Sequence, residues 1–196
     1  MKLLGTNVIK MPIRYRNTHG SIAHIPEDRH KHGLVLDASL EENLASKNYF
    51  TAGFHSLGFI RFSQWKSYSE KLISKFDVRS GQGSQAVVRS MSGGNQQKAI
   101  IAREIDAEQD VIIAVQPTRG LDVGAIEYIH HQLIEQRVNG KGILLISFEL
   151  EEILNISDRI LVLYEGRIAA EFLPRETSMQ EIGLYMAGGL RLNSIA

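Results

Sequence analysis

The segment from Ser92 to Lys98, SGGNQQK, combines residue types that can bind an anion. Paired glycines let a backbone approach a ligand closely, because neither carries a Cβ atom that would keep the ligand away. The residues that follow, AIIAREI, are predicted to continue as a helix. The first N–H groups of a helix form the positive end of its dipole. With the Ser92 hydroxyl as a further donor, the sequence predicts an anion site. A flexible loop with an ordinary helix cap explains this segment alone equally well.

A second candidate position lies where the apolar run Val111–Val115 meets Gln116, Pro117 and Thr118. A buried strand that stops beside a polar turn presents a side chain to a site. In phosphate chemistry that side chain is usually a carboxylate, because Mg²⁺ and an attacking water need one. Here the strand ends in Val115 and the amide Gln116, which can hold a water but cannot accept its proton. The strand end therefore indicates either a nucleotide site that has lost its chemistry or no such site.

Histidines are the remaining residues that could carry chemistry. His30 and His32 lie in a polar turn without a thiol nearby in sequence, and His130 and His131, adjacent on a predicted helix, would point in different directions. We expect no metal site.

The elements that must position these residues alternate along the chain. Strands are predicted at 21–25, 111–115 and 143–147, the last two as short buried strands, and a hairpin at 160–164 and 167–172. Helices are predicted from Ser39, where Glu42 completes a capping box, then within 59–76, from 92, and at 124–137, 149–154 and 179–186. This order favours an α/β fold with a parallel sheet. Residues 39–90, helical with no strand signal, are predicted to be an insertion.

Composition narrows the class of protein. Lys plus Arg and Asp plus Glu are equal at 22 each, so no global field favours nucleic acid. The chain has no cysteine, no apolar run long enough for a membrane helix and no signal-like start. We expect a soluble chain, or the soluble piece of something larger.

The ordered set of motifs resembles that of ABC-transporter ATPases over roughly residues 20–190. The segment from Met91 to Lys98 is similar to the signature loop of that family. The match continues through the strand at 111–115, Pro117-Thr118, Gly120-Leu121-Asp122, the strand before Phe148-Glu149-Leu150, and the hairpin motifs SDRI and EGRI. Upstream, Ile25-Pro26-Glu27-Asp28-Arg29 resembles the Q-loop in the second ATPase half of simple-sugar importers, and the combination points towards their nucleoside-type branch.

The resemblance implies a P-loop NTPase-type (RecA-like) parallel sheet with an inserted ABC helical subdomain at about 39–90. Residues 1–196 would be a partial ABC ATPase domain lacking the N-terminal Walker A portion, because no G-x-x-x-x-G-K-[ST] occurs in the sequence. The missing strand would lie beside 143–147, so we expect that strand to expose apolar surface unless residues 1–20 take the vacant place.

Three further departures concern catalysis. Val115 stands where the family has a Mg²⁺-associated Asp, Gln116 where it has the Glu that polarises water, and Phe148 where it has the switch histidine. Neutral sequence drift in a buried strand could explain any one of these substitutions. Because all three positions are expected to surround the same γ-phosphate, together they favour a site that no longer hydrolyses ATP. The chain alone is predicted to be inactive.

The intact motifs imply a role in a partner's site. Residues expected to contact ATP and Mg²⁺ in a composite site with another ABC ATPase half are Ser92, Gly93, Gly94, Asn95, Gln96 and Asp122. Glu27, Asp28 and Arg29 are expected to meet transmembrane permease subunits at the cytoplasmic face of the membrane. A substrate-binding protein would act only indirectly, and nucleic acid is not an expected partner. The alternative is a non-enzymatic fragment that serves only as a protein-interaction module.

Overall fold

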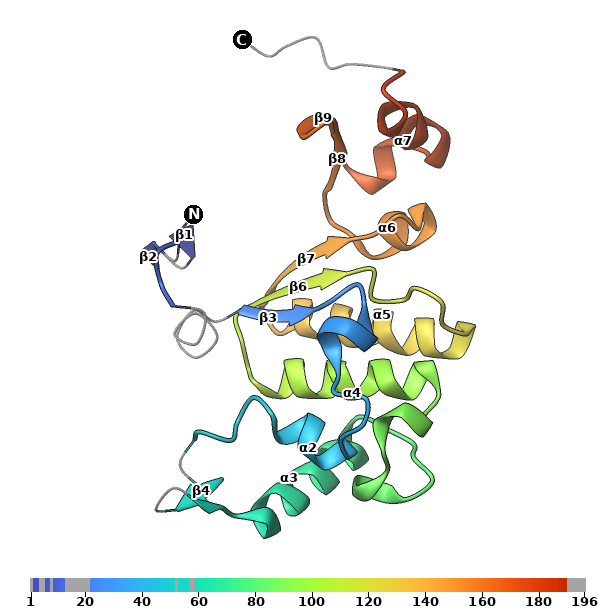
Figure 1. Ribbon diagram of the computed structural model, residues 1–196. Helices are drawn as coiled ribbons and strands as arrows, with labels where there is room; N and C mark the ends of the chain where they lie inside the picture. The colour runs from blue at the N-terminus through green and yellow to red at the C-terminus, as the bar shows by residue number, and fades with distance from the viewer. Residues whose placement is uncertain are drawn as a thin grey trace. The chain divides into compact units, whose positions relative to one another are not determined.

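The computed structural model describes residues 2–3, 6–7, 9–12, 22–51, 53–56 and 59–189 (Figure 1). The chain divides into two compact units, residues 1–144 and 145–196. Each unit is described by itself below. The predicted insertion at 39–90 belongs to the first unit, and its boundaries remain a prediction.

A three-stranded sheet organises the first unit. Its order is β3 (Ile22–Ile25), β6 (Val111–Val115) and β7 (Gly142–Ile146). Strands β3 and β6 are parallel, with Ile22 opposite Val111 and Ile25 opposite Ala114. This parallel pair confirms the predicted α/β fold with a parallel sheet.

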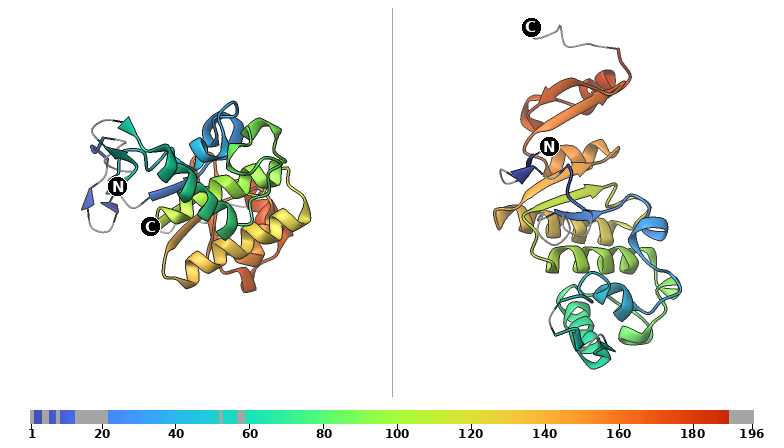
Figure 2. Two further views of the ribbon diagram at one scale, coloured as in Figure 1. Left: turned by 90° about the horizontal axis from the view of Figure 1, so that it is seen from below. Right: turned by 60° about the vertical axis from the view of Figure 1, so that its left-hand side comes forward.

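Two long helices cover one face of this sheet. Helix α4 (Gly93–Asp106) packs on β3 and on α5 (Val123–Val138), and the views in Figures 1 and 2 show the two helices side by side. Ile100 and Ile101 of α4, Ile112 of β6 and Ile129 of α5 are almost fully buried. The layer of aliphatic side chains between sheet and helices therefore fixes how both helices lie against the sheet.

A helical layer lies on the other side of α4. Helices α2 (Leu40–Ala45) and α3 (Phe62–Lys75) pack on each other and on α4, and Leu40, Leu44 and Leu72 are fully buried between them. The predicted capping box is confirmed, since Ser39 Oγ accepts from the Glu42 N–H and Glu42 accepts from the Ser39 N–H. Two short 3₁₀ turns, Gly83–Gln85 and Val88–Ser90, lead from this layer to α4.

The prediction of no strand within 39–90 was wrong. Strands β4 (His55–Ser56) and β5 (Phe59–Ile60) form a small antiparallel pair, with His55 opposite Ile60. Strands of two residues are too short to show the alternation of apolar and polar residues by which a strand is detected in sequence.

The prediction of a buried strand at 143–147 was also wrong. Strand β7 forms an edge of the described sheet, and Leu144 and Ile146 are 51% and 43% exposed. The expectation that this strand exposes apolar surface is thus met. In the segment 1–20, β1 (Lys2–Leu3) and β2 (Thr6–Asn7) pair antiparallel with each other, and most of the rest lies outside the described residues.

The second unit is a hairpin packed on two helices, α6 (Leu150–Ile156) and α7 (Met179–Met186). The hairpin pairs β8 (Ile160–Tyr164) with β9 (Arg167–Phe172) through Glu165 and Gly166, whose φ angles are +47° and +75°. Two successive positive φ angles match the right-handed twist of a two-residue hairpin, which confirms the predicted turn. A single 3₁₀ turn, Pro174–Glu176, joins β9 to α7.

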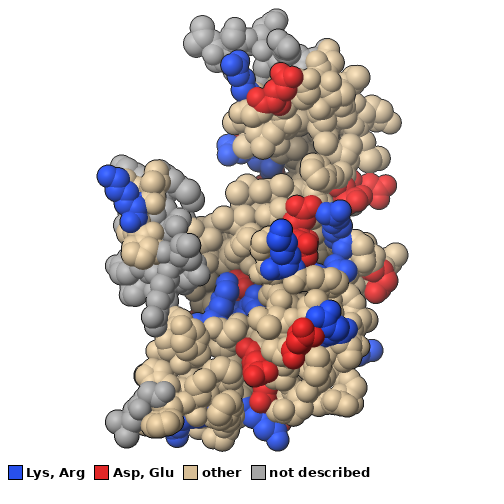
Figure 3. Space-filling view, in the orientation of Figure 1, with Lys and Arg blue, Asp and Glu red and all other residues tan. Residues whose placement is uncertain are grey.

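Charge is mixed on the face that Figure 3 shows, where Lys and Arg side chains are interspersed with Asp and Glu side chains. No helix in the described ranges is long and apolar enough to cross a bilayer.

A buried ionic network joins β3, α4 and the segment that follows α2. The Glu104 carboxylate, 1% exposed, accepts from the His24 backbone N–H at 3.1 Å, from Arg103 Nε at 3.1 Å and from Lys47 Nζ. Arg103 also donates to the Gly33 carbonyl at 2.8 Å. The carboxylate thereby links three segments that are far apart in the sequence.

The His24 side chain beside this network should titrate below 6.5, the value of a free imidazole. The His24 side chain is partly exposed, and the burial of the rest of it lowers the pKa of His24; Lys47 and His32 add to this, whereas Glu104 opposes it. His24 in the unfolded chain then binds a proton more tightly than His24 in the folded protein, so protonation favours unfolding. Above pH 6.5 the imidazole is neutral in both states and the free energy of unfolding is not reduced. Stability is lost as the pH falls from 6.5 through the folded pKa. Histidine-resolved NMR titration should show the low pKa, and His24→Gln should flatten the loss of stability in this range. A His24 pKa at or above 6.5 would contradict the prediction.

Candidate functional site

The predicted anion-binding segment lies at the edge of the first unit where strands β3 and β6 have their carboxyl ends. Helix α4 begins at this edge and runs back beneath the sheet, and α5 begins there too (Figures 1 and 2). In open α/β sheets ligands bind at the carboxyl ends of the strands, where helix N-termini converge. The residues at this edge are therefore the first candidates for a site.

Ser92 caps helix α4 and is exposed. Its Oγ accepts from the Asn95 backbone N–H at 3.4 Å and from Asn95 Nδ2 at 2.9 Å. The Asn95 side chain in turn accepts at Oδ1 from the backbone N–H of Arg79, at 2.7 Å. The helix cap that the alternative explanation of this segment invokes is present, and it is tied to the loop that follows α3.

The two glycines after Ser92 are needed for packing. A Cβ atom on Gly94 would lie 3.2 Å from the Ala125 Cβ of α5 and 3.6 Å from Oδ2 of Asp122. A Cβ atom on Gly93 would lie 3.0 Å from Nη2 of Arg29. Glycine at position 94 lets the start of α4 approach the start of α5 closely, and glycine at 93 leaves room for the Arg29 side chain, which the sequence alone did not reveal.

Asp122 is the N-cap residue of α5, and its Oδ1 accepts from the Ala125 N–H at 2.9 Å. The turn before it contains Gly120, whose φ of +68° favours glycine. The structure thus brings Asp122 together with Gly94 at the junction of two helix starts. The first turns of α4 and α5 both direct free N–H groups to this edge.

Gln96, predicted to contact a nucleotide, is 4% exposed. Its Nε2 donates to the Val88 carbonyl at 3.0 Å, and its Oε1 lies 2.9 Å from Nε2 of His30. Both ends of this amide are occupied inside the protein. A nucleotide contact by Gln96 stays a prediction, and the structure shows the residue joining α4 to two neighbouring segments.

The predicted partner surface, Glu27, Asp28 and Arg29, forms the start of a polar turn after β3. Asp28 is exposed and accepts from the backbone N–H groups of Lys31 and His30, and these bonds, led by that of Lys31, hold the pKa of Asp28 below its usual value. Its side chain caps the π-helical turn Arg29–Gly33. Asp28 therefore orders the turn it belongs to.

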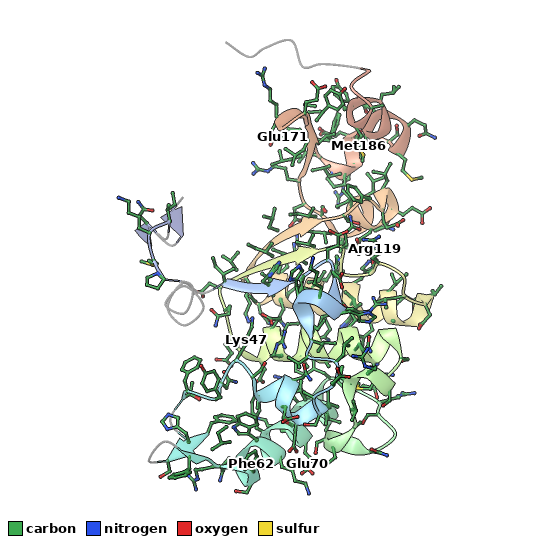
Figure 4. The ribbon with its side chains drawn as sticks, viewed as in Figure 1. Lys47, Phe62, Glu70, Arg119, Glu171 and Met186 are labelled. Atoms are coloured by element: carbon green, nitrogen blue, oxygen red, sulfur yellow. The ribbon has the colours of Figure 1, made fainter. Side chains whose placement is uncertain are left out.

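Arg119 was not found by sequence reasoning, yet it completes this edge. Its guanidinium pairs with Glu27, and its carbonyl accepts from Nη1 of Arg29 at 3.1 Å. Figure 4 labels Arg119 and Lys47, which lie towards opposite ends of α4 in this view. A basic residue between Thr118 and Gly120 was visible in the sequence, but only folding brings it to Glu27, 92 positions away.

The end of β6 carries no carboxylate. Val115 is partly buried, and Gln116 is 6% exposed with a φ of +48°. The Gln116 Nε2 atom has no hydrogen-bond partner among the described residues. In the second unit Phe148 is 72% exposed, in the loop before α6. None of the three side chains can accept a proton from water or bind Mg²⁺ as a carboxylate would. The described residues also contain no group of three His, Cys, Asp or Glu that could hold a metal.

Sequence comparison identifies relatives among import proteins. The chain is 54% identical over 171 residues to the guanosine import ATP-binding protein NupO of Bacillus subtilis, which covers 87% of this chain and 33% of NupO. It is 52% identical over 172 residues to the nucleoside import ATP-binding protein NupA of Lactococcus lactis, covering 88% of this chain and 34% of NupA. The ribose import ATP-binding protein RbsA of Oceanobacillus iheyensis is 38% identical over 168 residues, 86% of this chain and 33% of RbsA. The chain spans about a third of the length of the curated relatives it matches. No family model matches it.

Solved structures share the fold. The ATP-binding subunit of an ABC transporter superposes with a TM-score of 0.68 at 23% identity, covering 93% of this chain and 74% of that structure. A dimeric ATP-binding cassette in a post-hydrolysis state, bound to ADP and Pi, gives a TM-score of 0.63 at 20% identity, covering 84% and 66% of the two chains. At these identities the likeness shows the fold alone.

Proposed function

We propose that this chain is an ABC-transporter ATP-binding protein and serves as an ATP-binding half of an importer for nucleosides or simple sugars, as its similarity to import ATP-binding proteins supports. Its own site is degenerate, and it donates its signature segment, Ser92–Asn95, to an ATP site whose remaining groups lie on another ATPase half. The observation that carries this proposal is the asymmetry at one edge of the fold. An exposed Ser92 and two closely packed helix starts are present there, whereas the end of β6 lacks both carboxylates.

The chemistry fits a donor role. Phosphate oxygens need N–H and O–H donors, and the start of the 14-residue helix α4 supplies free backbone N–H groups beside the Ser92 hydroxyl. ATP and Mg²⁺ would occupy the composite site, with Mg²⁺ held by carboxylates of the other half. The chain's own part is to bind and orient the terminal phosphate through these donors.

The proposed function also implies which partners the chain contacts. The exposed turn at Glu27 and Asp28, braced by Arg29 and Arg119, would meet a transmembrane permease subunit, so the protein would sit at the cytoplasmic face of the membrane. A substrate-binding protein would act through the permease. The names of the two relatives that are more than 50% identical favour a nucleoside as the solute.

Replacing Ser92 by alanine should lower ATP turnover of the assembled transporter by about tenfold, because a hydrogen bond to a charged group contributes roughly 1.5 to 3 kcal/mol. The glycine N–H groups remain, so activity should not vanish. Gln116→Ala should leave turnover nearly unchanged. The measurement is phosphate release by the transporter in proteoliposomes at saturating ATP.

Ser178→Ala is the matched control. Ser178 caps α7 by accepting from the Glu181 N–H at 3.2 Å, so its loss removes a helix cap outside the candidate site. If Ser92→Ala and Ser178→Ala both retain full turnover, the Ser92 hydroxyl takes no part in hydrolysis and the proposed donor role is contradicted. The alternative, a module that only binds partner proteins, would then be favoured.

A further inference from the structure

The Asn95 side chain, expected from the sequence to contact a nucleotide, is engaged within the protein. Its Oδ1 accepts from the Arg79 N–H at 2.7 Å, and its Nδ2 donates to Ser92 Oγ at 2.9 Å. The backbone N–H of Arg79 can only donate, so the oxygen of the amide must face Arg79 and the nitrogen must face Ser92. The orientation of this amide is therefore fixed by the hydrogen-bond network.

This orientation decides what the Ser92 hydroxyl can do. A hydroxyl oxygen has two acceptor lone pairs and one donor hydrogen. In the protein the Asn95 N–H, at 3.4 Å, and Asn95 Nδ2, at 2.9 Å, both donate to Ser92 Oγ. Both acceptor positions are thus used, and the exposed hydroxyl keeps its hydrogen for an external acceptor.

The loop that holds Asn95 is itself anchored to α4. Lys98 Nζ donates to the Asp77 carbonyl at 3.0 Å and to its carboxylate at 2.9 Å, and Lys98 also lies 4.5 Å from the centre of the Tyr128 ring. Tyr128 of α5 donates to the Phe76 carbonyl at 2.9 Å. The position of Arg79, and through it that of Asn95, is thus set by contacts with both helices.

We propose that Asn95 is a positioning residue, which holds the Ser92 hydroxyl as a hydrogen-bond donor towards the terminal phosphate of ATP and does not itself contact the nucleotide. The inference rests on the proposed function, because it explains how Asn95 orients the Ser92 hydroxyl towards the phosphate. Asn95 acts through Ser92, because its own donor and acceptor are both occupied inside the protein.

Asn95→Leu, similar in shape but unable to hydrogen bond, tests this in a double-mutant cycle with Ser92→Ala. Freed from Asn95, the hydroxyl can occupy three staggered orientations, so turnover should fall about threefold. In the Ser92→Ala background the same change should cause no further loss, since no hydroxyl remains to be oriented. Asn139→Leu, at an exposed asparagine after α5, is the control in both backgrounds. Thermal unfolding of each variant shows whether it folds.

The outcomes separate the two proposals. If Ser92→Ala lowers turnover and Asn95→Leu does not, the role of Asn95 is overturned while the proposed function stands. Equal losses from Asn95→Leu in both backgrounds would indicate a merely structural or directly nucleotide-binding residue, and would also overturn it. If Ser92→Ala has no effect, both proposals fail together. A loss from Asn95→Leu in the protein that keeps Ser92, with no further loss in the Ser92→Ala variant, supports the positioning role. Should Asn95→Leu fail to fold, Asn95→Ser in the same cycle gives the same readout.

Discussion

Replacing Gly94 by valine is expected to reduce ATP turnover of the assembled transporter by about a hundredfold, the effect of misplacing reacting groups by about 1 Å. A Cβ atom at this position would lie 3.2 Å from the Ala125 Cβ. Ala125 is 7% exposed in the first turn of α5 and has no side-chain torsion by which it could move aside. The start of α4 must therefore shift, and Ser92 shifts with it.

The folded protein should survive this change with a loss of about 1 to 3 kcal/mol, as for other overpacked sites. Gly81→Val is the control, because a Cβ atom on Gly81 would meet no other atom within 4 Å. The pair Gly94→Ala and Ala125→Gly provides a rescue, since deleting one methyl group makes room for the other. Turnover of Gly94→Val within threefold of the unchanged protein would refute this account of why the glycine is there.

Replacing Glu104 by alanine should lower the free energy of unfolding by about 3 to 5 kcal/mol, the effect of removing one partner of a buried ion pair. Glu104 is 1% exposed and Arg103 is 8% exposed, so the guanidinium would remain buried beside the vacated position. The His24 N–H would lose its acceptor as well. Lys47, whose side chain is 34% exposed, can turn to water and should contribute less.

Urea denaturation of the purified protein measures this loss, with Glu70→Ala as the matched control. Glu70 also lies within a helix, but its pair with Lys66 spans 3.9 Å and both side chains are more than half exposed. Its removal should change stability by less than about 0.5 kcal/mol. A Glu104→Ala loss below 1 kcal/mol would mean that the network does not hold β3, α4 and the segment after α2 together.

The order and type of the main elements could be predicted from the sequence, because each has a local cause. Ser39 and Glu42 form a capping box within four residues, and Glu165 and Gly166 occupy a turn that only a few residue types adopt. The alternation of apolar strands with amphipathic helices specified the parallel sheet. The small β4–β5 pair has no such local pattern and was missed, and the exposure of β7 depends on which strands pair beside it.

The residue types at the candidate site were likewise visible in the sequence, including Ser92, the two glycines, Asp122 and the absence of carboxylates at Val115 and Gln116. The contacts between these residues and distant segments could not be predicted from the sequence. Only the tertiary structure places Gly94 against Ala125, Arg119 against Glu27 and Asn95 against Arg79, because these contacts join segments that the chain separates. Sequence determines which groups can donate or accept at a site. Packing between distant segments decides which of those groups are already occupied, and that is why the side chains of Gln96 and Asn95 are engaged within the protein.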